Sequence, residues 1–179
     1  KTFAGLIKNF DNSYNCIVLD LPGFGGSQMP STAWGLDEYA NLVKDFLKKI
    51  NAQPFAVVAH SNGAALAIRA VATEKIATNK MVLLGAAGIR NREKFKKLLL
   101  KTVAKTGKVA TFWLPKSSKK KLQQKLYGTV GSDLLVVPHM QETFKKTVRQ
   151  DVQQDARKID LPVLLIYGGS DTATPPLYG

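Results

Sequence analysis

The segment from Phe55 to Arg69, FAVVAHSNGAALAIR, constrains the fold of this chain more than any other. Its apolar start predicts a buried strand, and the alanine-rich run that follows has the composition of a helix packed closely on a sheet. Ser61 stands where the strand ends and the helix begins. A serine at such a junction is either a reactive group on a sharp turn or an ordinary helix N-cap.

The alternation of strands and helices continues on both sides of this segment. Apolar runs predict further buried strands at 15–22, 80–88 and 163–168, and helical spacing of apolar residues predicts helices at 2–10 and 36–50. Continuous apolar strands separated by helices are typical of parallel sheets that are covered on both faces. The sequence therefore predicts an α/β fold, with a mostly parallel sheet and helices on both of its faces.

Residues 91–158 interrupt this alternation with helical spacing alone, which predicts a helical cap inserted into a core formed by residues 1–90 and 159–179. From residue 90 to residue 158 there are 18 lysines and arginines against 5 acidic residues, so this stretch carries the whole net charge of +13. Such charge attracts anionic lipids, nucleic acids or acidic substrates, and it also occurs on solvated lysine-rich helices. We favour the solvated surface and expect no nucleic-acid partner, because no nucleic-acid motif accompanies the lysines.

Cysteine usage and known motifs exclude several classes of site. Cys16 is the single cysteine, so neither an intramolecular disulfide nor a cysteine-based metal site can form, and a cytoplasmic location fits. The glycine-rich GFGGS lacks the spacing of dinucleotide-binding and phosphate-binding loops. No apolar run approaches the roughly 18 residues of a membrane span. We expect no metal and no cofactor.

Asp171 follows the last predicted strand, in the loop GGSDTATP. Open α/β sheets place their sites at the carboxyl ends of the strands, which is where this residue falls. Alone, Asp171 is best interpreted as a turn residue. Paired with Ser61 on another strand of the same sheet, it becomes a candidate acid of a Ser–His–acid set. Ala59 and Gly63 lie two residues before and two residues after Ser61, and both are small. Such a turn needs small residues at these places, because we expect the strand and the helix to approach closely there.

Three segments together resemble the α/β-hydrolase family: DLPGFGGS at 20–27, AHSNGA at 59–64 and YGGSDTATP at 167–175. They occur in the order of that family and after successive predicted strands. The resemblance covers nearly the whole chain and implies an α/β-hydrolase fold truncated at both ends. It also implies that 20–27 is a mainly structural loop near the site, and that 91–158 is the cap.

The resemblance implies a role for each residue of the site. Ser61 would be the nucleophile, Asp171 the acid that orients a histidine, and Asn62 the donor of one backbone N–H to the oxyanion. The family's histidine follows a further strand, and its second oxyanion donor precedes the first helix, so both are expected outside these 179 residues. Taken alone, the 179 residues are then expected to hydrolyse little.

The two histidines of the chain do not replace the missing base. His60 directly precedes Ser61, and consecutive side chains at a strand end point to opposite faces. His139 lies in the expected cap and is interpreted as a residue near a helix start, with a place in the lining of the substrate pocket as the alternative.

The expected activity is covalent acyl transfer from a small carboxylic ester by a serine hydrolase. A peptidase, a thioesterase or a carbon–carbon hydrolase of the same family remains an alternative, as does a non-catalytic ligand-binding protein on the same fold. The partner is then a small-molecule acyl substrate. The basic cap would favour an anionic one, or contact with a membrane surface. The sequence does not indicate an oligomeric state.

Overall fold

The computed structural model describes residues 3–10, 12–89 and 138–179 of the chain. The chain divides into two compact units, residues 1–30 and residues 31–179. The described residues of the first unit form one helix, α1 (Ala4–Phe10), followed by turns and irregular backbone.

The buried strand predicted at 15–22 is wrong. The backbone there has no regular secondary structure, and the side chains of Ile17 and Val18 are 47% and 54% exposed. A strand requires a neighbouring strand for its N–H and C=O groups. No described residue of the first unit provides such a neighbour, so the apolar run forms no hydrogen-bonded ladder.

The glycine-rich loop of the first unit closes around Asp20. The Asp20 carboxylate accepts a hydrogen bond from the N–H of Gly26 (3.0 Å), and the Asp20 carbonyl accepts one from the Ser27 hydroxyl. Gly25 has a φ of +55°, and a Cβ on this residue would collide with the Asp20 carboxyl group. These contacts within the loop agree with the mainly structural role expected of residues 20–27.

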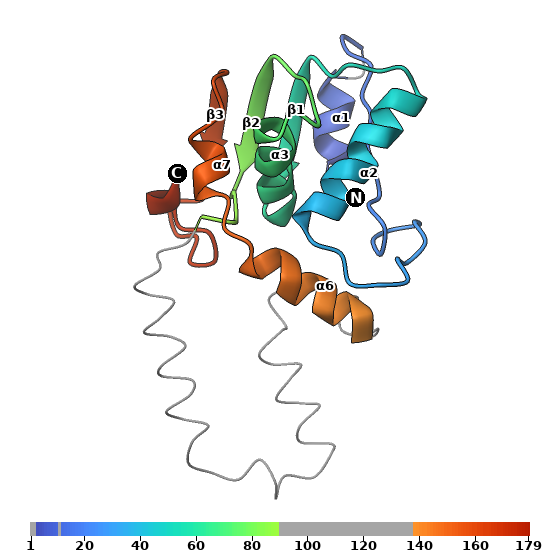
Figure 1. The fold of residues 1–179 in the computed structure, drawn as a ribbon. Coiled ribbons are helices and arrows are strands. Elements are labelled where there is room, and N and C mark those ends of the chain that lie inside the picture. The colour runs from blue at the N-terminus through green and yellow to red at the C-terminus, as the bar shows by residue number, and fades with distance from the viewer. Residues whose placement is uncertain (1–2, 11, 90–137) are drawn as a thin grey trace, which may run out of the picture. The chain divides into compact units, whose positions relative to one another are not determined.

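A three-stranded parallel sheet forms the centre of the second unit (Figure 1). Its strands are β1 (Ala56–His60), β2 (Lys80–Leu84) and β3 (Val163–Ile166), in that spatial order. The ends of all three strands are in register: His60 pairs with Leu84, and Leu84 pairs with Ile166. The prediction of a parallel sheet is confirmed. Loops that follow the three strands therefore meet at one edge of the sheet.

Helix α3 (Asn62–Ala72) packs against β1, and helices α2 (Leu36–Lys49) and α7 (Gln153–Ala156) pack against α3 (Figure 1). Small side chains allow this close approach, because most of the buried residues of α3 are alanines. Arg69 of α3 joins the three helices through its guanidinium. Its Nε lies 2.6 Å from Oδ2 of Asp155, and its Nη1 lies 3.1 Å from Oδ2 of Asp37.

Strand β3 differs from its prediction in burial. All four of its residues are exposed, from 38% at Val163 to 56% at Leu164, although their sequence is that of a buried strand. An apolar parallel strand is buried only where elements pack on both of its faces. β3 is the last strand in the order and pairs with β2 alone within the described part of the chain.

The expected cap is described only in part. Residues 90–137 lie outside the described residues, and the rest of the segment contains α6 (Pro138–Arg149) and α7. A short 3₁₀ helix (Pro176–Tyr178) ends the chain. None of the helices in the described ranges is long and apolar enough to cross a membrane.

Candidate active site

Ser61 directly follows β1 and has a backbone conformation that is rare for a residue with a side chain, φ 54° and ψ −121°. Such a conformation costs about 1–3 kcal/mol and persists only where surrounding contacts hold it. Three backbone hydrogen bonds do so. The Ser61 N–H donates to Leu84 (2.9 Å), and the Ser61 carbonyl accepts from the N–H groups of Ala64 (3.0 Å) and Ala87 (3.1 Å). The junction is a strained sharp turn fixed from two sides.

The Ser61 hydroxyl does not act as a helix cap. Ser61 occupies the N-cap position of α3, but its side chain makes no capping hydrogen bond to the described first turn of that helix. A capping serine also has extended backbone, and Ser61 does not. Of the two interpretations of this serine, the geometry therefore favours the sharp turn.

The two small residues that flank Ser61 have different surroundings. Ala59 is buried at the end of β1, as expected. A Cβ on Gly63, however, would meet no atom of the described residues within 4 Å, outside its chain neighbours and its own helix backbone. The close approach expected at Gly63 is therefore not seen among the described residues.

Asp171 lies in the loop after β3, and its carboxylate organises that loop. Oδ1 accepts hydrogen bonds from the N–H groups of Ala173 (2.8 Å) and Thr174 (2.9 Å), and Oδ2 accepts one from the Thr174 hydroxyl (2.7 Å). These donors lower the pKa of Asp171, the backbone N–H of Thr174 most and its hydroxyl next. The turn role considered for Asp171 is thus present, and it keeps the carboxylate ionised.

We expect Thr174→Val to raise the pKa of Asp171 toward that of an ordinary aspartate. Valine removes the hydroxyl donor, whereas the backbone N–H of residue 174 remains. A folded-state pKa below the unfolded value stabilises the fold at neutral pH, and this contribution is lost as the pH falls through the folded pKa. The measurement is a carbon-13 NMR titration of the Asp171 carboxyl group. Ser170→Ala, an exposed neighbour, should leave that titration unchanged, and an equal shift in both variants would contradict this assignment.

The loop GAAG at 85–88 connects the Ser61 turn with the Asp171 loop. Sequence analysis placed these residues in a strand, but β2 ends at Leu84. The Ala87 N–H donates a hydrogen bond to the Ser61 carbonyl (3.1 Å), and the Gly85 N–H donates one to the carbonyl of Ile166 at the end of β3 (2.8 Å). A Cβ on Gly85 would lie 3.7 Å from Oδ2 of Asp171, so the two loops are in close proximity. The only signal in the sequence is the pair of glycines, both of which have positive φ.

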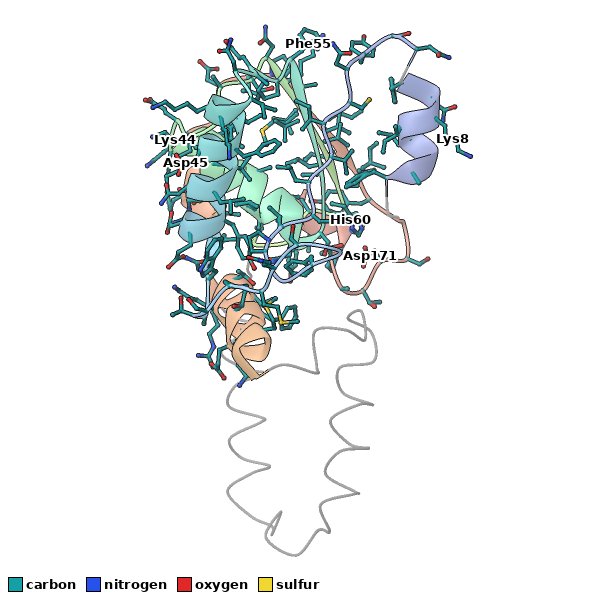
Figure 2. The ribbon with its side chains drawn as sticks, turned by 90° about the vertical axis from the view of Figure 1, so that its right-hand side faces the viewer. Lys8, Lys44, Asp45, Phe55, His60 and Asp171 are labelled. Carbon is teal, nitrogen blue, oxygen red and sulfur yellow. The ribbon has the colours of Figure 1, made fainter. Side chains whose placement is uncertain are left out.

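His60 lies near Asp171 at the same end of the sheet (Figure 2). An electrostatic interaction with His60 is the last of the causes that lower the Asp171 pKa, and no hydrogen bond between the two is seen among the described residues. The side chain of His139 lies outside the described residues. Within the described part of the chain, no three His, Cys, Asp or Glu side chains are grouped as metal ligands.

The side chain of Asn62, the first residue of α3, contacts helix α6. Its Nδ2 donates a hydrogen bond to Oγ1 of Thr147 (3.2 Å). Sequence analysis singled out Asn62 for its backbone N–H alone and missed Thr147. The isolated threonine carries no signal in the sequence, since its neighbour in space lies 85 residues away.

Known proteins of the same fold can now be compared with this arrangement. One solved structure is that of MGS-M2, an alpha/beta hydrolase enzyme from a Medee basin deep-sea metagenome library (20% identity, TM-score 0.69, 99% of this chain and 70% of that one). A second is an esterase, EaEST, from Exiguobacterium antarcticum (16% identity, TM-score 0.67, 98% of this chain and 71% of that one). A third is a mutant of the meta-cleavage product hydrolase CumD from Pseudomonas fluorescens IP01 (18% identity, TM-score 0.64, 98% of this chain and 69% of that one). At these identities the likeness shows the fold.

The sequence itself gives the family. A search of curated proteins finds no match. A family model described as alpha/beta hydrolase fold matches residues 1–126, well over half of the chain. This match, the parallel sheet and the sharp turn between β1 and α3 agree, and the chain belongs to the alpha/beta hydrolase fold family.

Proposed function

We propose that the protein is a serine hydrolase that acts by covalent acyl transfer on a small carboxylic ester, with Ser61 as the nucleophile. The observation that carries the proposal is the turn at Ser61. This turn holds a serine at a positive φ between β1 and α3 and leaves its hydroxyl without a capping bond. A strained conformation that several contacts maintain is typical of a reacting group.

In the proposed reaction, Oγ of Ser61 attacks the acyl carbon while a histidine outside the 179 residues takes its proton. The carbonyl π electrons move to the oxygen. The backbone N–H of Asn62 stabilises this oxyanion, together with a second donor that also lies outside these residues. Collapse of the intermediate expels the alcohol, which takes the proton from the histidine. Water then hydrolyses the acyl-enzyme by the same steps.

The surroundings of Asn62 and Asp171 support the roles proposed for them. Asn62 is the first residue of α3, and the first N–H groups of a helix have no acceptor within the helix and lie at its positive end. Asp171 has a lowered pKa, so it is a carboxylate at neutral pH and can hold a histidine in the required orientation. Its loop hydrogen bonds fix the carboxylate before a histidine binds.

The alternatives to ester hydrolysis fall into two classes: other hydrolases that use the same residues, and a non-catalytic binding protein. An ester substrate is supported by the esterase among the similar structures, which also include a meta-cleavage product hydrolase. Carbon–carbon bond hydrolysis would use the same nucleophile and is kept as an alternative. Peptidase and thioesterase chemistry would use the same residues. A non-catalytic ligand-binding protein would keep the fold without the reaction. The basic residues of 90–158 lead us to propose an anionic acyl group among the substrates to be tested.

We expect a fluorophosphonate probe to label the full-length protein at Ser61, with the site located by mass spectrometry of the labelled peptide. p-Nitrophenyl acetate should be hydrolysed by the same preparation. The 179 residues alone, which lack the proposed base, should hydrolyse that ester at least about 10³-fold more slowly. Labelling at another residue, or equal rates for the two proteins, would contradict the proposed nucleophile or the proposed base. Absence of both labelling and hydrolysis in the full-length protein would favour the binding protein.

A further inference from the structure

Helix α6 contacts the core of the second unit through polar side chains that lie along one of its faces. Thr143 accepts a hydrogen bond from the N–H of Trp34 (3.0 Å), and Thr147 accepts one from the side-chain amide of Asn62 (3.2 Å). Gln150, which directly follows the last residue of α6, accepts one from the N–H of Leu36 (2.6 Å). Thr143 and Thr147 are four residues apart and therefore lie on one face of the helix. Helix α6 is therefore held to the start of α2 and to the start of α3 by directional contacts.

The contact at Thr147 differs from the other two because it reaches the residue that follows Ser61. Thr147 is 2% exposed, and its hydroxyl donates its own proton to the carbonyl of Phe144 (3.1 Å). With its proton used within α6, the oxygen is left as an acceptor, and the Asn62 amide fills that role. A buried acceptor of this kind is costly to leave without a donor, which keeps the side chain of Asn62 in place.

We propose that Thr147 is a positioning residue for the oxyanion donor, an inference that rests on the proposed hydrolase function. The hydrogen bond from Nδ2 fixes the side chain of Asn62 and adds to the bonds from Ala64 and Ala87 that hold the carbonyl of the peptide group joining Asn62 to Ser61. That peptide carries the N–H proposed to bind the oxyanion. A donor contributes fully only when it is aimed at the charge before the reaction begins. Because Thr147 belongs to α6, the orientation of the Asn62 backbone N–H then also depends on the position of that helix.

The chain contains a matched control for this inference. Thr143 lies one turn before Thr147 on the same helix, is also 2% exposed and also accepts one N–H bond. Its donor is the backbone of Trp34, which precedes α2 and is not part of the turn at Ser61. Thr143→Val and Thr147→Val therefore remove the same chemical group from equally buried sites, and only the second removes a contact to Asn62.

We expect Thr147→Val in the full-length protein to lower kcat for p-nitrophenyl acetate about tenfold, with KM changed by less than about twofold. Thr143→Val should leave kcat unchanged while lowering the unfolding temperature by a similar amount. Thr147→Ser keeps the hydroxyl and should restore kcat. An equal loss of kcat in the two valine variants, or no loss in Thr147→Val, would overturn the proposal.

A second measurement does not depend on activity. In the NMR spectrum of the free protein, the backbone amide of Asn62 should shift and exchange faster in Thr147→Val than in wild type, and should be unchanged in Thr143→Val. An unchanged Asn62 amide in Thr147→Val would overturn the positioning role. If the wild-type protein neither reacts with fluorophosphonate nor hydrolyses esters, the hydrolase proposal fails, and the amide measurement decides by itself whether Thr147 orients this N–H group.

Discussion

Replacing Ser61 with alanine is expected to lower kcat/KM of the full-length protein for p-nitrophenyl acetate by about 10⁴-fold or more. Alanine removes the only atom of this residue that can form the acyl-enzyme. The backbone contacts of residue 61 with Leu84 and Ala87 do not involve the side chain, so the turn itself should persist. Activity should therefore fall without a comparable loss of stability.

The measurement is steady-state hydrolysis, with fluorophosphonate labelling of the same samples. Ser31→Ala is the control, since Ser31 is an exposed serine outside the turn. It should retain wild-type rates and labelling. The unfolding temperature of each variant shows whether a loss of activity reflects a loss of fold. Undiminished labelling in a folded Ser61→Ala protein would contradict the assignment of the nucleophile.

Gly88→Ala is expected to lower the free energy of unfolding by about 3 kcal/mol, since overpacking costs about 1–3 kcal/mol and a strained backbone adds to it. Gly88 has a φ of +94°, which is unfavourable for alanine. The added Cβ would also lie 2.8 Å from Cβ of Ala65 in α3 and 2.8 Å from Cγ2 of Val152. Both neighbours are buried and have little room to move.

The control for this variant is Gly63→Ala. A Cβ at Gly63 meets no described atom within 4 Å beyond its chain neighbours and helix backbone, and Gly63 lies within a helix, where alanine is favoured over glycine by up to about 1 kcal/mol. Denaturant unfolding should therefore show a loss at Gly88 and no loss at Gly63. A comparable loss at both glycines would show that the crowding at Gly88 is not its cause.

The sequence predicts those elements of the fold that are stabilised by residues within their own segment. Helix α2 shows its apolar spacing, the acidic residues of its first turn and the lysines of its last, and the structure forms it at Leu36–Lys49 as expected. The order of strands and helices after residue 54 is likewise readable. The run at 15–22 shows where this reading fails. Its residues favour a strand, but a strand forms only where another strand is within hydrogen-bonding reach.

In the candidate site, too, some residues can be predicted from the sequence and the contacts between distant segments cannot. Ser61 and Asp171 are candidates from the sequence because each lies in the turn or loop after a predicted strand, and the register of parallel strands places the ends of these strands at one edge of the sheet. The contacts that hold them are not found. Thr147 reaches Asn62 across 85 residues of sequence, and GAAG looks like the end of a strand until its glycines are seen at positive φ. Contacts between segments that are distant along the chain produce no periodic pattern in the amino-acid sequence.

The loop at 85–88 acts as a common strut for the two halves of the proposed catalytic machinery. The N–H of Ala87 donates to the carbonyl of Ser61, and the N–H of Gly85 donates to the carbonyl of Ile166, the last residue of β3 before the loop that contains Asp171. A displacement of this loop would therefore move the turn at Ser61 and the loop that contains Asp171 at the same time. Changes in residues that never meet a substrate can then alter the alignment of nucleophile and acid together. Among the described residues, this loop is where we expect tolerance of substitution to be lowest.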